Sequence, residues 1–82
     1  MQSFSFQYKG VLSASTAVRI IEDGDIHYRV SLPPNLNFVI APAGRPGKEG
    51  RIIWLQINKP WEILVNRELI QALGEGLESS GI

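Results

Sequence analysis

Residues 17–32, AVRIIEDGDIHYRVSL, contain two apolar runs on either side of a turn. An apolar run leads into the turn signal EDGD at residues 22–25, and the stretch from Ile26 to Leu32 then alternates apolar and polar side chains. A period of two places alternate side chains on opposite faces of a strand, and Asp and Gly favour a tight reversal of the chain. This segment therefore predicts an antiparallel hairpin.

The length of the turn decides which side chains of this hairpin meet. A two-residue loop sets Arg19 opposite Tyr28, whereas a three-residue loop pairs Ile20 with Tyr28 and Val18 with Val30. The three-residue loop gathers the apolar side chains on one face. We therefore predict the three-residue loop.

Toward the N-terminus, aromatic residues at every second position predict a first strand. Phe4, Phe6 and Tyr8 alternate with polar residues, and the strand is expected to end near Leu12. The small, polar residues 13–16, SAST, predict a bend into the first strand of the hairpin.

Toward the C-terminus, two further strands are expected. Pro33 and Pro34 end the hairpin because proline cannot donate to a strand ladder, and the apolar residues 38–41 predict a fourth strand. Residues 42–50 contain three glycines and two prolines, which predicts a mobile, exposed connection. The strand expected at residues 51–57 is apolar on both faces, with Ile52 and Trp54 on one side and Ile53, Leu55 and Ile57 on the other.

The last third of the chain allows two helix starts. In one version residues 61–65 extend the sheet and Asn66 caps a helix that runs to about Glu78; in the other the helix begins at Pro60. We predict the Asn66 cap, because Asn is a favoured cap residue and Glu68 complements the helix dipole in the first turn. The apolar stripe of this helix consists of Leu69, Ile70, Leu73 and Leu77.

Two glycines weaken this helix, by about 1 kcal/mol each relative to alanine. Either the helix frays after Leu73, or Gly74 allows it to approach the sheet closely.

Together these elements predict an α+β fold in one domain over residues 1–82, an antiparallel meander of about five strands followed by one C-terminal helix. The predicted core consists of Phe4, Phe6, Tyr8, Val18, Ile20, Tyr28, Val30, Phe38, Ile40, Trp54, Leu69, Ile70 and Leu73.

Composition excludes several classes of protein. Eight basic and eight acidic residues cancel, so no overall field attracts nucleic acid or an anionic membrane. The start, MQSFSF, has neither the basic region nor the apolar run of a secretory signal, and no stretch is long enough to span a membrane, so we expect a cytoplasmic protein. The chain has no cysteine, and a small core without disulfides commonly relies on a second subunit.

No motif supports catalysis, a cofactor or a metal. His27 is the single histidine and lies on the polar side of its strand, and no serine stands in a G-x-S-x-G context. The acidic residues around Gly24 lack the ligand spacing of a calcium loop. Residues 44–51 are glycine-rich and basic, but they lack the Gly-Lys-Ser/Thr of a P-loop. We therefore expect no enzyme activity.

The leading hypothesis is a small interaction module, a homodimer that uses an apolar sheet face at Ile53, Leu55 and Ile57. A helix of about 13 residues spans only about 20 Å, too little to cover five strands. The alternative is single-stranded nucleic-acid binding on the open sheet, where aromatic side chains stack on bases and cations contact phosphates. Its candidate residues are Tyr8, Lys9, His27, Tyr28, Arg29, Arg51 and Trp54. The order of elements resembles the Pur-type sheet-and-helix folds, without a shared motif.

Overall fold

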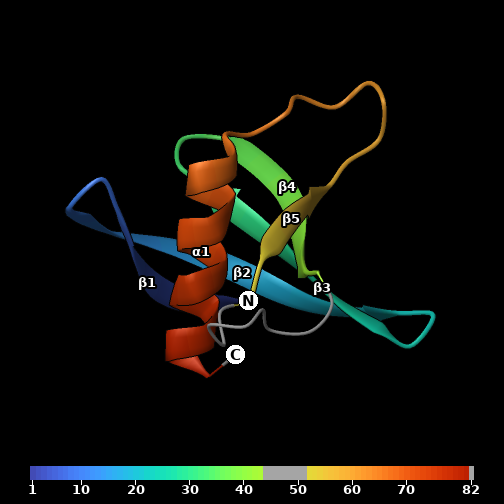
Figure 1. Ribbon diagram of the computed structural model, residues 1–82, viewed down its shortest axis with the longest axis horizontal. Coiled ribbons are helices and arrows are strands. Elements are labelled where there is room, and N and C mark those ends of the chain that lie inside the picture. The colour runs from blue at the N-terminus through green and yellow to red at the C-terminus, as the bar shows by residue number, and fades with distance from the viewer. Residues whose placement is uncertain (44–51, 82) are drawn as a thin grey trace.

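The computed structural model describes residues 1–43 and 52–81, and it has one sheet with a helix packed on one face (Figure 1). The elements are β1 (Gln2–Tyr8), β2 (Val11–Glu22), β3 (Asp25–Leu32), β4 (Leu36–Pro42), β5 (Trp54–Ile57) and α1 (Arg67–Ser80). The five strands pair in sequence order, all antiparallel. The predicted α+β meander is confirmed. Most of the predicted mobile connection, residues 44–50, and Arg51 lie outside the described residues.

The first turn is not where the sequence predicted it. The bend expected at residues 13–16 is wrong, because β2 runs without a break and the chain reverses at Lys9 and Gly10. Both turn residues have positive φ, 52° and 78°, as in the two-residue turns whose twist matches that of antiparallel strands. The small residues of β2 lie opposite aromatic ones, Ser15 opposite Phe4, which leaves room for the ring.

The second turn also has two residues, so the predicted three-residue loop is wrong. Asp23 and Gly24 have φ values of 52° and 83°, and Arg19 lies opposite Tyr28. The three-residue loop was predicted because it would gather the apolar side chains on one face, without regard to the geometry of the turn. The observed turn satisfies the right-handed twist of the strands instead, and Asp and Gly both tolerate positive φ.

This register changes the core contributed by β2. Val18 is 37% exposed and Ile20 is partly exposed, both on the face turned away from α1, so the prediction that they are core residues is wrong. Ala17 takes their place in the core, opposite Val30.

The remaining core is close to the prediction. Phe4, Phe6, Tyr28, Val30, Phe38, Ile40, Trp54, Ile70 and Leu73 are buried as predicted, and Leu77 joins them. Tyr8 and Leu69 are partly buried against this cluster. All of these side chains lie between the inner face of the sheet and α1.

The helix begins as predicted at the Asn66 cap. The Asn66 Oδ1 atom accepts hydrogen bonds from the backbone N–H groups of Glu68 and Leu69, at 2.8 and 3.4 Å. These bonds satisfy two of the N–H groups that a helix leaves without intrahelical partners. The prediction that residues 61–65 extend the sheet is wrong, because the chain there forms no strand and residues 61–64 are exposed.

Two glycines let α1 lie close to both edge strands, which confirms the close-approach version. A Cβ atom added at Gly74 would lie 2.0 Å from the Trp54 indole of β5, and one added at Gly76 would lie 2.6 Å from the Ser5 carbonyl oxygen of β1. Residues two apart point to opposite sides of a helix. The helix therefore fits between β1 and β5 because it lacks side chains on both flanks.

Candidate interaction surface

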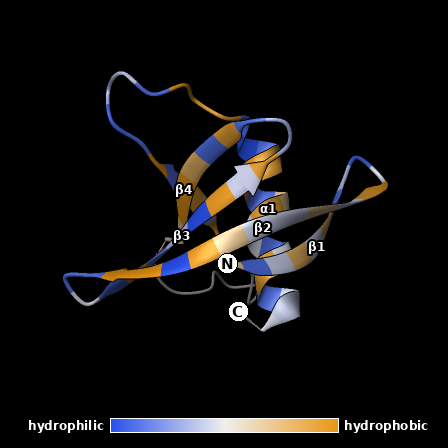
Figure 2. Cartoon of the chain, turned by 180° about the vertical axis from the view of Figure 1, so that it is seen from behind, coloured by the Kyte–Doolittle hydropathy of each residue, from blue (hydrophilic) through white to orange (hydrophobic). Residues whose placement is uncertain are grey.

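In the part of the chain that the structure describes, no helix covers the face of the sheet turned away from α1, and Figure 2 shows the molecule with this face in front. We call it the outer face; its central side chains are Val18, Ile20, His27, Arg29, Val39, Leu55 and Ile57, which alternate with the buried ones. One row crosses four strands, from Val18 through Arg29 and Val39 to Ile57. This row is apolar apart from a single cation.

Two of the three predicted interface residues, Leu55 and Ile57, lie together at one side of the outer face, and Ile53, just before β5, also lines the hollow beside α1. Ile53, Leu55 and Ile57 are 45%, 39% and 46% exposed. Trp54, which alternates with them, is buried under α1. Ile53 precedes β5 and keeps the alternation, because its carbonyl oxygen accepts a hydrogen bond from the Ala43 N–H at 2.7 Å. The strand therefore presents an apolar stripe to solvent.

The free edge of β5 is occupied by a helix side chain. The Gln71 amide donates to the Ile52 carbonyl oxygen at 2.8 Å and accepts from the Trp54 N–H at 2.9 Å. One side-chain amide thus makes the two bonds that a neighbouring strand would make. At the other edge, α1 lies against the Ser5 carbonyl at Gly76. Pairing with a partner strand is therefore hindered at the β5 edge, where Gln71 occupies the backbone groups of Ile52 and Trp54.

The segment between β5 and α1, residues 58–65, extends beyond the sheet as the large loop in Figure 1. We call it the arm. Its apolar side chains are strongly exposed: Trp61 by 77%, Ile63 by 77% and Leu64 by 74%. The sequence predicts a strand at residues 61–65, so the exposure of these side chains was not expected from it. Pro60 does not exclude a strand at residues 61–65, because proline is tolerated at the start of a strand.

A hollow of about 670 Å³ lies between the outer face and the base of the arm. Its apolar lining includes Ile20, Val39 and Ile57. Three carboxylates of the β2–β3 turn, at residues 22, 23 and 25, also line it, as do Arg29 and, from the arm, Lys59 and Glu62.

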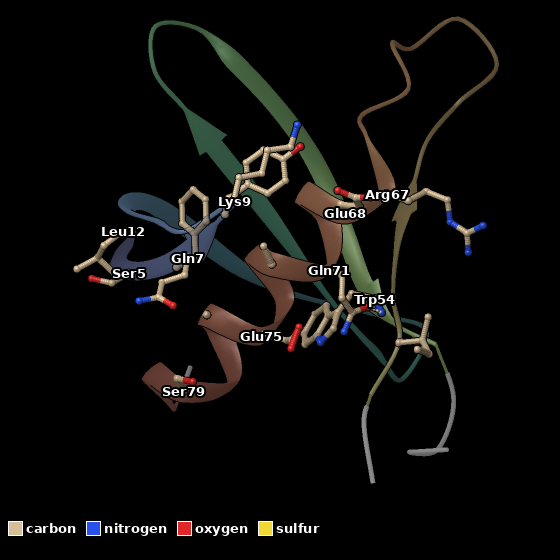
Figure 3. Close-up of a pocket in the computed structure, with 15 residues that line it drawn as sticks. Ser5, Gln7, Lys9, Leu12, Trp54, Arg67, Glu68, Gln71, Glu75 and Ser79 are labelled. Carbon is tan, nitrogen blue, oxygen red and sulfur yellow. Dashed lines mark hydrogen bonds between the residues drawn. The ribbon is translucent and has the colours of Figure 1, made fainter. Parts of the chain in front are cut away.

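A second hollow, of about 940 Å³, runs along the exposed side of α1 (Figure 3). Lys9 of the β1–β2 turn and Arg67 of the helix contribute cations, and Glu68 and Glu75 contribute carboxylates. Because both signs of charge are present, the composition of this hollow does not indicate whether it would bind an anionic or a cationic ligand.

The structure separates the candidate nucleic-acid residues. Tyr28 and Trp54 are in the core, with ring centroids 5.7 Å apart, and the Trp54 Nε1–H donates to Glu78 at 3.0 Å. His27 and Arg29 lie on the outer face. Tyr8 and Lys9 lie apart from both pairs, at the β1–β2 turn, where the Lys9 Nζ atom lies 5.4 Å from the Tyr8 ring centroid. Arg51 lies outside the described residues.

Comparisons with protein-family models, with curated proteins and with solved structures find no match to this chain. Within residues 1–43 and 52–81, no three His, Cys, Asp or Glu side chains are grouped so that they could hold a metal ion. In the same residues, no helix has the length and apolar character needed to cross a membrane.

Proposed function

We propose that this chain is a small non-enzymatic interaction module that forms a homodimer through the apolar stripe of β5. The observation that carries the proposal is the exposure of Leu55 and Ile57 on a face that α1 does not cover, with Ile53 exposed directly before them in the chain. A monomer rarely leaves a contiguous apolar patch in water, because burying such a patch is favourable. The exposed apolar side chains of the arm follow the stripe in sequence and offer further apolar surface to a partner.

A two-fold dimer is the arrangement that these features favour. The helix hinders strand pairing at the β5 edge, whereas the outer face can meet the same face of a second copy. Arg29 lies within the apolar row and needs a carboxylate or water contact in the dimer, since an unpaired buried charge costs several kcal/mol. We further propose a cytoplasmic location, which a chain without cysteine fits.

Single-stranded nucleic-acid binding has less support. Stacking needs accessible aromatic rings, and two of the candidate rings, Tyr28 and Trp54, are in the core.

Sedimentation at micromolar concentration tests the proposal. The parent protein is expected to dimerise, and Leu55→Glu should sediment as a folded monomer because the new charge would be buried in the interface. Leu12→Glu is the matched control: Leu12 is 66% exposed at the far end of β2, so the same change should leave the dimer intact.

A parent that is monomeric at all accessible concentrations would refute the homodimer. A sizing column run with an oligonucleotide mixture at low salt addresses the alternative, since nucleic-acid binding would give a salt-sensitive shift in elution.

A further inference from the structure

The arm holds an aromatic side chain away from the body of the protein on a defined base. The Gln56 side-chain amide donates to the Ile63 carbonyl oxygen at 3.0 Å and accepts from the Val65 N–H at 2.8 Å. Within the arm, the Glu62 N–H donates to the Lys59 carbonyl oxygen at 2.9 Å, which closes a backbone turn that contains Trp61. The arm is therefore bonded to β5 near its C-terminal end, and Trp61 projects from the turn as an exposed ring. Tryptophans presented in this way are typical binding anchors.

The hollow beside the arm offers a surface that fits such an anchor. Its volume, about 670 Å³, lies within the range of pockets that bind ligands larger than one side chain. Ile20, Val39 and Ile57 contribute apolar surface to its lining. Trp61 does not line the hollow of its own subunit.

The charges of the arm and the hollow are complementary. The Lys59 Nζ atom lies 5.4 Å from the Trp61 ring centroid, so a cation lies beside the ring. Around the hollow stand the three acidic residues of the β2–β3 turn, at positions 22, 23 and 25, together with Arg29 and with Lys59 and Glu62 of the same subunit's arm. The carboxylates of this lining outnumber its lysine and arginine cations. A Lys59 side chain brought by the arm of a second molecule would therefore be attracted to the acidic turn.

We propose that the arm of each subunit docks in the hollow of a second copy, with Trp61 against Ile20, Val39 and Ile57. This inference rests on the proposed homodimer and extends it, since Ile57 belongs both to the apolar stripe and to the hollow. Each copy contributes one arm and one hollow, so a two-fold axis closes the assembly without unused sites.

Truncation of the anchor is the first test. Trp61→Ala is expected to raise the dimer dissociation constant about thirtyfold or more, the effect typical of a central tryptophan. Trp61→Phe should raise it less, because an aromatic ring remains. Circular dichroism of both variants should match that of the parent, since Trp61 is 77% exposed and contributes little to the core.

Charge reversal with rescue tests the contact between the arm and the acidic turn. Lys59→Glu and Asp25→Lys should each weaken the dimer, and the double variant should recover most of the loss because opposite charges face each other again. If the double variant is as weak as the sum of the two single changes, these residues do not meet and the docking mode is wrong.

Acrylamide quenching identifies what covers Trp61. Subtracting the signal of Trp61→Phe, which retains the buried Trp54, isolates the fluorescence of Trp61. Quenching should fall as the parent is concentrated through its dimerisation range. Unchanged quenching, or protection that appears only when an oligonucleotide mixture or phospholipid vesicles are added, would overturn the proposal in favour of a free arm or of another occupant. A dimer that is sensitive to Leu55→Glu but not to Trp61→Ala would refute arm docking alone and leave the face-paired homodimer standing.

Discussion

Gly74→Ala is expected to destabilise the protein although alanine is the better helix former. Intrinsic propensity favours alanine over glycine by about 1 kcal/mol in a helix interior. Against this, the new Cβ atom would lie 2.0 to 2.3 Å from three carbon atoms of the Trp54 indole. Overpacking of a core costs about 1–3 kcal/mol and occasionally more.

The Trp54 ring cannot move aside at low cost. Its Nε1–H donates to Glu78 on the next helical turn at 3.0 Å, and the Tyr28 ring lies 5.7 Å away. We therefore expect the upper end of the overpacking range, about 3 kcal/mol, and a net loss of about 2 kcal/mol in the free energy of unfolding.

Urea denaturation followed by circular dichroism measures this loss, with every variant at the same protein concentration because dimerisation adds to the apparent stability. Trp54→Leu provides the matched background. It removes the indole, so Gly74→Ala should there be neutral or stabilising. If Gly74→Ala raises the stability of the parent by about 1 kcal/mol, as propensity alone requires, the close packing of α1 on β5 is not what limits this position.

Two further changes test the contacts that position α1. Gln71→Leu should lower the free energy of unfolding by about 1–3 kcal/mol, because it leaves the Trp54 N–H and the Ile52 carbonyl without their side-chain partner, and it should speed amide exchange at Trp54. Gln71→Glu keeps the acceptor for that N–H and should cost less; equal losses in the two variants would show that the bonds contribute little. Asn66→Ala should cost about 1 kcal/mol through the lost cap, measured by the same denaturation, whereas Asn66→Ser should restore most of it. An Asn66→Ala protein as stable as the parent would mean that the helix start is held by packing alone.

The candidate surface was predictable only in part. The alternation around Trp54 is enough to predict that Ile53, Leu55 and Ile57 share one face, because successive side chains of a strand point to opposite faces of the sheet. Whether that face is covered depends on where α1 lies, which depends on contacts far apart in the chain. The same limit explains the nucleic-acid candidates: Tyr28 and Arg29 are adjacent in sequence, yet one is in the core and the other on the outer face.

Local patterns were enough to predict the class of fold, the order of the strands and the start of the helix, because alternation and capping depend on neighbouring residues. The register of β2 could be found only from the tertiary structure. The two-residue turn matches the twist of the strands, and with this register Ala17 is buried in the core whereas Val18 faces away from α1. The tertiary structure also decided the role of the two helix glycines. In sequence they appear only as helix-weakening residues, and their function becomes apparent once the backbones of β1 and β5 stand where a Cβ atom would otherwise be.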